Sequence, residues 1–543
     1  MLIDRREEYQ ASFYMKPSQP LHKPGNMSTI TVSIRSNLTS EVFASSNITI
    51  PRDIRTTNFT QFHTTITPDE AAPNSNNTFA ITFPKGAAGQ SFFFSLVSLF
   101  PPTYKDRPNG LRKDIAQNLA DLNPKFLRFP GGNNLEGQTI DTRWQWKKNI
   151  GPLIDRPGRP GDWGYYNSDG LGYLEFLEWC EDMEIEPLLT VYAGYSLDDS
   201  GISPANTVWE DELDFYIDEA LEQLEYANGG LDTKWGALRA AHGHPEPFNI
   251  KIVEIGNEDW FSDSYYWRYP RYLSALKAAY PNITYIASQA IEVSPANKNT
   301  TIAPGGMWDL HHYETPQFYK NSFNFFDNFN TVHDLPGVEI FVGEYSVLSR
   351  DNAAGVGWSA SEGRFVYPTT IAAIGEAIFG LAMERNPHVA TLSSYAPLLQ
   401  NFNAYQWTPN LIAFSADPKD TVLSTSYYMN RMFSTFKGEE TLTVVNTVGD
   451  FDPVWWHSSR EGKRVFVKLV NAGTVKAPVT LDFDFKVAKV NGTILGHEEE
   501  FGFNYMGNAT AISPRTFDVK KGIKGKKVQW EVPGFSIVVL EVN

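Results

Sequence analysis

The chain has 543 residues, of which 42% are hydrophobic and 14% aromatic, and its formal net charge is −17 at pH 7. This composition excludes a disordered chain and allows several domains with large buried cores. The acidic balance disfavours nucleic acid and anionic membranes as partners, whereas it does not repel a neutral polysaccharide.

The first 100 residues predict a β-sandwich, which ends at Pro101-Pro102. This region is rich in Ser, Thr, Asn and Phe and poor in helix signals. Short alternating runs, which are typical of half-buried strands, recur along it. They cover residues 9–14, 29–34, 57–67, 78–83 and 91–99. We therefore assign residues 1–100 to a partial β-sandwich domain.

From about residue 110, helical patterns alternate with short apolar runs. The predicted helices are 111–122, 171–183, 211–227, 270–280, 361–385 and 424–436. The predicted strands are 125–129, 187–192, 250–255, 283–288, 308–313, 338–343 and 389–394. This alternation indicates a parallel sheet with helical crossovers. Because no G-x-G-x-x-G follows any strand, we favour a (β/α)₈-type barrel over residues 101–437 rather than a dinucleotide-binding fold.

The last hundred residues return to strand patterns. Alternating runs cover 442–446, 464–471, 479–485 and 528–532, and the chain ends on 536–542. We assign residues 438–543 to a C-terminal β-sandwich.

Two predicted barrel strands end in a glutamate. Strand 250–255 is followed by Gly256-Asn257-Glu258, and strand 338–343 is followed by Glu344. In a barrel the carboxyl ends of the strands meet at the face that carries the active site. Glycosidic cleavage needs such a pair: one carboxylic acid protonates the leaving oxygen, and the other carboxylate attacks or stabilises the anomeric carbon. Retaining enzymes hold the two carboxyls about 5–5.5 Å apart.

A structural role as helix caps or surface ion pairs is the alternative for these glutamates. For a single glutamate at a strand end, a structural role and a catalytic role would be about equally plausible. Here two strands each deliver one, and an aromatic residue, Trp260 or Tyr345, lies within two positions of each. The combination favours catalysis.

Strand 308–313 carries the adjacent pair His311-His312. Neighbouring residues of a strand point to opposite faces, so at most one of them lines the barrel mouth. With one histidine and no third ligand evident, the pattern argues against a metal site, and we expect no cofactor. Cys180 lies on an apolar helical pattern and is expected to be buried; it has no second cysteine for an intrachain disulfide.

A family resemblance rests on several motifs. The run Lys125-Phe-Leu-Arg-Phe-Pro-Gly-Gly-Asn-Asn-Leu-Glu-Gly137 resembles the signature of family 51 glycoside hydrolases. Further matching runs are 146–152, 243–248, 254–258, 343–345, 394–401 and 407–412. The similarity extends from about Ser91 to Phe436 and more loosely to the C-terminus. Gly-Asn-Glu alone would indicate only the wider clan of retaining barrel hydrolases.

This resemblance implies a retaining α-L-arabinofuranosidase that releases terminal arabinose from arabinoxylan, arabinan or related side chains. It implies Glu258 as general acid/base and Glu344 as nucleophile. It also implies that Asn257 hydrogen-bonds the sugar 2-hydroxyl and that Asn133 contacts the furanose ring.

The resemblance also implies supporting groups around this pair. Tyr313 would lie near the nucleophile, and His311 and Arg128 would support the site. Trp146 would form a wall of it.

One departure concerns the start of the barrel. The family's barrel begins with a strand that ends in a Glu-rich motif, and fungal and plant-like members then insert a carbohydrate-binding-type sandwich. Neither that strand nor the start of the insert is found, and 91–99 resembles the last strand of the sandwich. We therefore expect a chain truncated at its N-terminus, whose barrel lacks strand 1. In that case strands 125–129 and 389–394 are not hydrogen-bonded to each other, and no glutamate from residues 1–100 reaches the pocket.

Two other functions stay open at this point. One is another retaining barrel glycosidase, such as an endo-glucanase or xylanase; the other is a truncated, non-catalytic carbohydrate-binding protein. The expected partner in each case is a polysaccharide or oligosaccharide.

N-x-S/T sequons point to a secreted glycoprotein, although a Thr- and Asn-rich segment also produces them by chance. They begin at Asn26, Asn37, Asn47, Asn58, Asn76, Asn282, Asn299, Asn491 and Asn508. The sequence shows no transmembrane run and no signal-peptide pattern after Met1.

Overall fold

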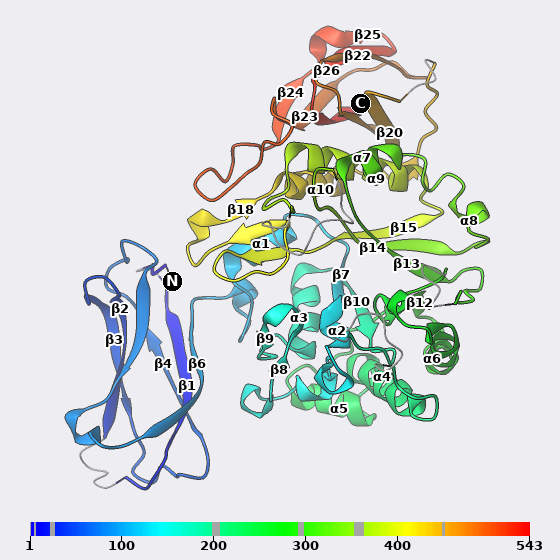
Figure 1. Ribbon diagram of the computed structural model, residues 1–543. Helices are drawn as coiled ribbons and strands as arrows, with labels where there is room; N and C mark the ends of the chain where they lie inside the picture. Colours follow the sequence, from blue (N-terminus) through cyan, green and yellow to red (C-terminus); the bar gives the residue numbers. More distant parts are fainter. Residues whose placement is uncertain are drawn as a thin grey trace.

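The computed structural model describes residues 2–4, 7–21, 28–197, 207–291, 298–351, 363–447 and 451–543. Figure 1 shows a blue N-terminal sandwich to the left of a central helix-and-strand region, with the C-terminal sheets (orange to red) above that region. Among the described helices, none combines the length and the apolar character that a membrane crossing requires.

The N-terminal strands form two three-stranded antiparallel sheets, ordered β4-β1-β6 and β3-β2-β5. The strands are β1 (Tyr9–Pro17), β2 (Thr29–Ser36), β3 (Val42–Thr49), β4 (Thr60–Ile66), β5 (Asn77–Thr82) and β6 (Phe92–Phe100). Alternate residues of β1, such as Phe13 and Met15, are buried between the sheets. β6 pairs with β1, so the predicted strand 91–99 belongs to the sandwich and not to the barrel.

The central region contains a parallel sheet of seven described strands, ordered β15-β14-β13-β12-β11-β10-β7, which forms a nearly closed barrel. These are β7 (Phe126–Phe129), β10 (Glu186–Val191), β11 (Ile252–Ile255), β12 (Thr284–Ala287), β13 (Met307–Glu314), β14 (Glu339–Val347) and β15 (Ala390–Tyr395). All seven predicted barrel strands are present. β7 and β15 are the two edges and are not paired with each other, which confirms the prediction for this pair.

Helices surround the barrel, and short strands extend its loops (Figure 1). The helices are α1 (Lys113–Ala120), α2 (Asn133–Glu136), α3 (Tyr173–Met183), α4 (Leu213–Asn228), α5 (Lys234–Ala241), α6 (Tyr265–Ala279), α7 (Pro316–Asn321), α8 (Phe329–Val332), α9 (Thr370–Arg385) and α10 (Thr425–Thr435). The loop strands are β8 (Arg159–Pro160), β9 (Tyr166–Asn167), β16 (Leu399–Asn401), β17 (Ile412–Phe414) and β18 (Val422–Leu423). The sequence did not predict α2, α5, α7 or α8.

Two helix starts differ from the prediction. The predicted start of α9 at 361 lies outside the described residues, and the described segment 363–369 is not helical. α9 begins at Thr370, because Pro368 precedes the N-cap Thr369, whose side chain accepts from the Ala372 amide. α6 begins five residues before Pro270, which lies inside the helix. Its buried tyrosine stripe, Tyr265, Tyr269 and Tyr272, outweighs the hydrogen bond that Pro270 removes.

The C-terminal strands form a sheet ordered β19-β20-β21-β27-β23-β24 and a smaller sheet ordered β22-β26-β25. They are β19 (Glu440–Thr441), β20 (Val454–Glu461), β21 (Arg464–Asn471), β22 (Ala477–Asp482), β23 (Val490–Gly496), β24 (Arg515–Asp518), β25 (Ile523–Lys524), β26 (Lys527–Val532) and β27 (Ser536–Val542). The predicted strand 442–446 is wrong: these residues follow β19 as an irregular segment in which Val445 is 81% exposed.

Candidate active site

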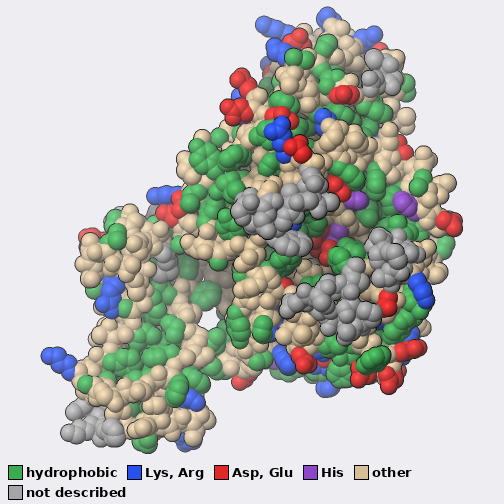
Figure 2. All heavy atoms as spheres, in the orientation of Figure 1, with side chains coloured by type: hydrophobic (Ala, Val, Ile, Leu, Met, Phe, Trp, Pro, Cys, Tyr) green, Lys and Arg blue, Asp and Glu red, His purple; other side chains and the backbone are tan. Residues whose placement is uncertain are grey.

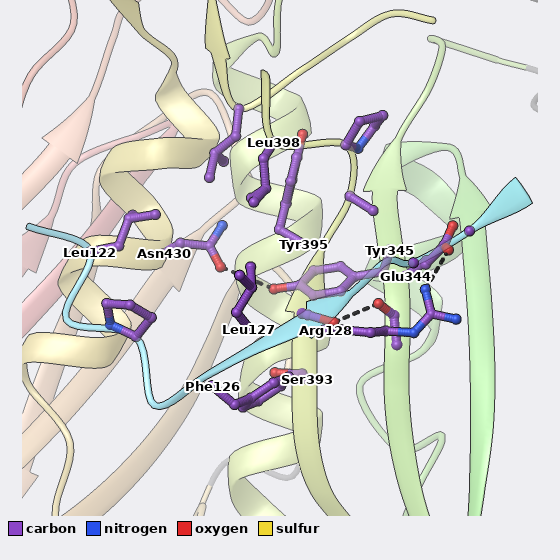
Figure 3. A pocket seen from close by; sticks show the side chains of 18 of the residues that line it. Leu122, Phe126, Leu127, Arg128, Glu344, Tyr345, Ser393, Tyr395, Leu398 and Asn430 are labelled. Carbon is purple, nitrogen blue, oxygen red and sulfur yellow. Dashed lines mark hydrogen bonds and ion pairs between the residues drawn. The ribbon is translucent and has the colours of Figure 1, made fainter. Parts of the chain in front are cut away.

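A cavity of about 1710 Å³ opens at the carboxyl ends of the barrel strands. It continues along the seam between β7 and β15, where Phe126 and Leu127 face Ser393 and Tyr395 (Figure 3). Glu258 and Glu344 both line it, and none of the described residues before Leu119 does. Figure 2 draws one face of the molecule, on which acidic and histidine side chains lie to the right of the centre.

The turn after β11 has a backbone that places Glu258 at the cavity. Gly256 has φ +89°, and a Cβ there would come within 1.9 Å of the Asp259 carboxylate. Glu258 itself has φ +48°, in the left-handed region that ordinary residues rarely adopt. Asp259 anchors the turn through Arg268, at 2.8 Å, and Ser288, at 2.7 Å. The close packing explains why a glycine precedes the Asn257-Glu258 pair.

Glu344 lies inside β14 and is held by two donors. The Arg128 Nη1 donates to its Oε1 at 2.9 Å (Figure 3), and the Tyr313 hydroxyl donates to its Oε2 at 2.5 Å. Burial and the Glu344 charge raise the pKa of Tyr313 well above its usual value, so its hydroxyl stays protonated and remains a donor.

Glu258 is held by His311 and stands close to Glu344. The His311 Nδ1 lies 2.9 Å from Glu258 Oε1. One carboxylate oxygen of each glutamate and a ring nitrogen of His311 all lie within 4.8 Å of one another. This separation suits the roughly 5–5.5 Å spacing of a retaining pair and leaves too little room for the water of an inverting one.

Arg128 connects the site to the barrel interior. Its guanidinium donates to Glu254 at 2.6 and 3.0 Å and to the Asn257 side-chain oxygen at 2.7 Å. Burial alone would lower the pKa of Arg128, but the Glu254 and Asp309 charges raise it well above its ordinary value. Arg128 therefore presents a fixed cation to Glu344.

His311 is a second cation of the site. Its Nε2 lies 2.7 Å from Asp309 Oδ2. Burial alone would lower the pKa of His311, but the Asp309 and Glu344 charges raise it well above its usual range. Burial likewise opposes ionisation of Asp309, yet His311 brings the pKa of that carboxyl down to about 2. Gly343 permits this arrangement, because its amide donates to Asp309 at 2.9 Å and a Cβ there would come within 2.1 Å of that carboxylate.

A divalent cation does not suit these donors, although Glu258, His311 and Glu344 have the spacing of a metal site. A protonated histidine has no lone pair to offer, and Arg128 already neutralises Glu344.

The structure brings seven of the eight predicted site residues together and places one, Trp146, elsewhere. The residues that line the cavity are Arg128, Asn133, Glu258, Tyr313 and Glu344. His311 does not line it but hydrogen-bonds Glu258, and Asn257 likewise accepts a hydrogen bond from Arg128. Trp146 is not among the lining residues.

Trp146 is buried in the helical core instead of forming a wall of the site. Its indole donates to the Glu219 backbone carbonyl at 3.0 Å and packs against Tyr173, Tyr226 and Trp235. Trp146 belongs to a family-like run, but it does not lie near the active site in space. Cys180 is buried, as predicted, and burial raises the pKa of its thiol to about 12.

Several site residues escaped the sequence analysis. Trp407 packs against Tyr313 at 4.9 Å, and Trp163 meets Trp407 edge-on at 5.4 Å. Both tryptophans line the cavity. Trp407 begins one of the family-like runs, which was an available signal. Trp163 has φ +63°, a loop conformation that periodicity does not reveal.

The chain is similar to proteins of one kind along almost its whole length. Family models described as the α-L-arabinofuranosidase 1 domain and the α-L-arabinofuranosidase C-terminal domain match residues 118–331 and 343–536. α-L-Arabinofuranosidase A of Aspergillus niger is 37% identical over 543 residues, which cover 99% of this chain and 80% of that protein. The probable α-L-arabinofuranosidase A of Aspergillus flavus is 39% identical over 529 residues, covering 96% and 78%.

Solved structures agree with these matches. The arabinose-bound α-L-arabinofuranosidase MgGH51 superimposes with a TM-score of 0.89 at 36% identity, covering 100% of this chain and 83% of that chain. The arabinose complex of an α-L-arabinofuranosidase from Thermotoga maritima gives 0.60 at 21% identity, covering 80% and 90%, and supports the fold.

Proposed function

Since this chain belongs to the α-L-arabinofuranosidases of glycoside hydrolase family 51, we propose that Glu258 and Glu344 carry its two chemical steps. The chain hydrolyses terminal α-L-arabinofuranosyl residues with retention of configuration. The observation that supports the assignment is the opposed hydrogen bonding of the two carboxyls: Arg128 and Tyr313 hold Glu344, whereas His311 holds Glu258.

In the first step, a Glu344 oxygen attacks the anomeric carbon while Glu258 gives its proton to the departing glycosidic oxygen. The products are a covalent arabinosyl ester of Glu344 and a free alcohol. Arg128 and Tyr313 hold the attacking carboxylate in position, which reduces the reorganisation that the attack requires.

In the second step, Glu258 takes a proton from water, and the resulting hydroxyl oxygen attacks the same carbon. The ester bond breaks, arabinose leaves, and Glu344 returns as a carboxylate. Two inversions give net retention. The short Glu258–Glu344 separation suits this sequence, because a single water occupies the place that the leaving group has vacated.

The substrate contacts fall to the two asparagines. We assign the sugar 2-hydroxyl to the Asn257 carboxamide, a contact that strengthens in the transition state. Asn133 contacts the furanose from the first position of α2, which follows β7. The faces of Trp163 and Trp407 at the same cavity suit the next sugar of arabinoxylan, arabinan or a related side chain.

We further assign the chain as a secreted glycoprotein. The sequon asparagines at positions 37, 47, 58, 76, 282, 299, 491 and 508 are all exposed, so each is accessible to glycan attachment. Asn26 lies outside the described residues. Expression through a eukaryotic secretory pathway should give a mass that drops on treatment with an N-glycosidase; an unchanged mass would remove this assignment.

Hydrolysis of an aryl α-L-arabinofuranoside, followed by NMR, tests the catalytic assignment. The first sugar released should keep the α configuration, and added methanol should yield the methyl α-L-arabinofuranoside. Aryl β-D-xylopyranoside and β-D-glucopyranoside serve as controls and should turn over far more slowly. Release of the β anomer would exclude double displacement.

A further inference from the structure

Glu136 is a buried carboxyl that contacts both asparagines to which the proposed function assigns sugar contacts, Asn133 and Asn257. It closes α2, one turn after β7, and is only 2% exposed. Its Oε2 accepts from Asn133 Nδ2 at 2.9 Å and from Asn257 Nδ2 at 3.2 Å. Its Oε1 is buried and has no hydrogen-bond partner among the described residues. One oxygen thus gathers two carboxamides that lie 124 positions apart in sequence.

We propose that Glu136 is a positioning residue that fixes the Asn133 and Asn257 carboxamides by accepting one N–H from each. A carboxamide has two N–H groups, so one on each asparagine stays available to the sugar. The inference rests on the proposed function, in which these asparagines contact the arabinose. Glu136 does not itself touch the substrate.

The Asn257 carboxamide needs this second anchor. Arg128 Nη2 donates to its oxygen at 2.7 Å, and Glu136 accepts from its nitrogen at the other end. With both anchors, a flipped amide would place its NH₂ against a guanidinium and its oxygen against a carboxyl. Without Glu136, only Arg128 limits rotation of the Asn257 carboxamide. The Asn257 N–H assigned to the sugar then no longer has a fixed direction.

The acceptor does not have to be an anion. Burial, and next the charge of Glu258, raise the pKa of Glu136 well above its usual value, while the Asn133 amide opposes the shift. A protonated Glu136 keeps Oε2 as the acceptor and carries its proton on the unpartnered Oε1. Glutamine reproduces this arrangement, with its carbonyl oxygen in place of Oε2 and its NH₂ in place of Oε1.

The main chain of Glu136 has a separate structural role. Its carbonyl oxygen accepts from the Ser196 hydroxyl at 2.7 Å, and any residue at this position would do the same. Substitutions at Glu136 therefore remove the side-chain acceptor and leave this contact in place.

Two variants separate positioning from packing. Glu136→Gln keeps the acceptor, and Glu136→Met fills a similar volume without one. Each is compared with the unchanged chain on an aryl α-L-arabinofuranoside and on its 2-deoxy analogue, which lacks the hydroxyl assigned to Asn257. Calorimetric titration with arabinose provides a readout that does not depend on turnover, and melting temperatures report on folding.

For Glu136→Met we expect kcat/KM on the parent glycoside to fall about 10- to 100-fold, because two oriented contacts weaken together. On the 2-deoxy analogue the same variant should lose only about 3-fold or less, and its arabinose affinity should fall. Glu136→Gln should stay within about 3-fold of the unchanged chain in every assay. A double variant with Asn257→Ala should lose little more than Asn257→Ala alone.

Equal loss by Glu136→Met on both glycosides would overturn the inference, as would full activity and affinity in that variant. So would Glu136→Gln behaving like Glu136→Met. If Glu136→Met fails to fold, Glu136→Leu, which also lacks an acceptor, takes its place in the same assays and with the same expected losses. Failure of the unchanged chain to turn over the parent glycoside would instead count against the proposed function, while its arabinose binding would still test Glu136.

Discussion

Strand β13 presents two adjacent histidines to opposite environments. His311 points into the barrel, between Asp309 and Glu258, and the neighbouring charges raise its pKa. His312 points outward against Phe318, Phe325 and Phe379, where burial lowers its pKa to about 4. One residue along the strand therefore separates an imidazolium of the active site from a neutral ring of the core.

The comparison extends to the whole strand. On its inner face, Asp309, His311 and Tyr313 each have a charged or polar partner in the site. On its outer face, Trp308 and His312 pack against the phenylalanines of the α7–α8 region. The side chains of the inner face align the two glutamates, and those of the outer face pack the barrel against its helices. Substitutions on the two faces should therefore differ in kind: the first affects turnover, and the second affects stability.

The largest effect is expected at Glu344 of the neighbouring strand, β14. Glu344→Gln removes the nucleophile while keeping its shape, so kcat on an aryl α-L-arabinofuranoside should fall by a factor on the order of 10⁴ or more. Mass spectrometry should detect no arabinosyl ester. Glu339→Gln, at the opposite end of β14, is the matched control and should stay within about 3-fold of the unchanged chain. Comparable losses in both variants would disprove the assignment of Glu344.

Glu258→Ala should give the next largest loss, and its size should depend on the leaving group. With a poor leaving group the loss should be about 10²- to 10⁴-fold, because protonation of the departing oxygen is lost. A good leaving group needs little protonation, so the first step should be nearly unaffected, and azide should then rescue turnover by attacking in place of activated water. The check is a series of aryl glycosides measured with and without azide. A loss that is independent of the leaving group would argue against Glu258 as the acid.

The two histidines give a smaller but more direct test. His311→Gln replaces a cation that contacts Asp309 and Glu258, so kcat/KM should fall about 10- to 100-fold. His312→Phe keeps an aromatic ring among the phenylalanines and should change kcat/KM by less than about 3-fold. Both are measured on one aryl glycoside at the same pH. If His312→Phe were the more damaging variant for turnover, the division between the two faces would be wrong.

Much of this division follows from sequence alone, because a strand alternates and a barrel gathers its strand ends. That reasoning placed Glu258 and Glu344 at one face and separated His311 from His312, and the family resemblance added Arg128 and Tyr313. It did not find Glu136 or Trp163, because Glu136 lies in a four-residue helix and Trp163 in a three-residue 3-10 helix, both too short to show a period. It also failed for Trp146, whose neighbours Tyr226 and Trp235 come from helices that the site motif does not specify.

Helix and strand ends show the same limit. The periodic pattern identified α9, but its start depends on the cap at Thr369. The alternation at 442–446 predicted a strand, yet only Leu442 contributes to a core there. Alternation of apolar and polar residues shows which side chains can share a face. It does not show whether a second strand is present to pair with the segment.

The last expected effect concerns stability against pH, where the two histidines should act with opposite sign. His312 has a pKa of about 4 when folded and about 6.5 when unfolded. Between these values the unfolded chain binds a proton that the folded chain does not. Its contribution to stability is therefore complete above about pH 6.5 and is lost as the pH falls towards 4, up to about 3 kcal/mol. His311, whose folded pKa is raised, stabilises the fold below about pH 6.5 and loses that contribution as the pH rises through its folded value.

Chemical denaturation at pH 7 and pH 4.5 separates these contributions. His312→Phe should reduce the stability lost between the two pH values by about 2–3 kcal/mol, because one buried neutral histidine no longer opposes folding in acid. The remaining loss has another contributor of the same kind: His457 of β20, whose pKa burial also lowers to about 4, so His457→Phe is the matched variant and should reduce the loss by a similar amount. His311→Gln should not flatten the profile in this window, because His311 is protonated in both the folded and the unfolded chain at pH 4.5. A profile that His312→Phe leaves unchanged would mean that the outer histidine is not neutral in the fold, and the contrast between the two faces of β13 would then reduce to their packing.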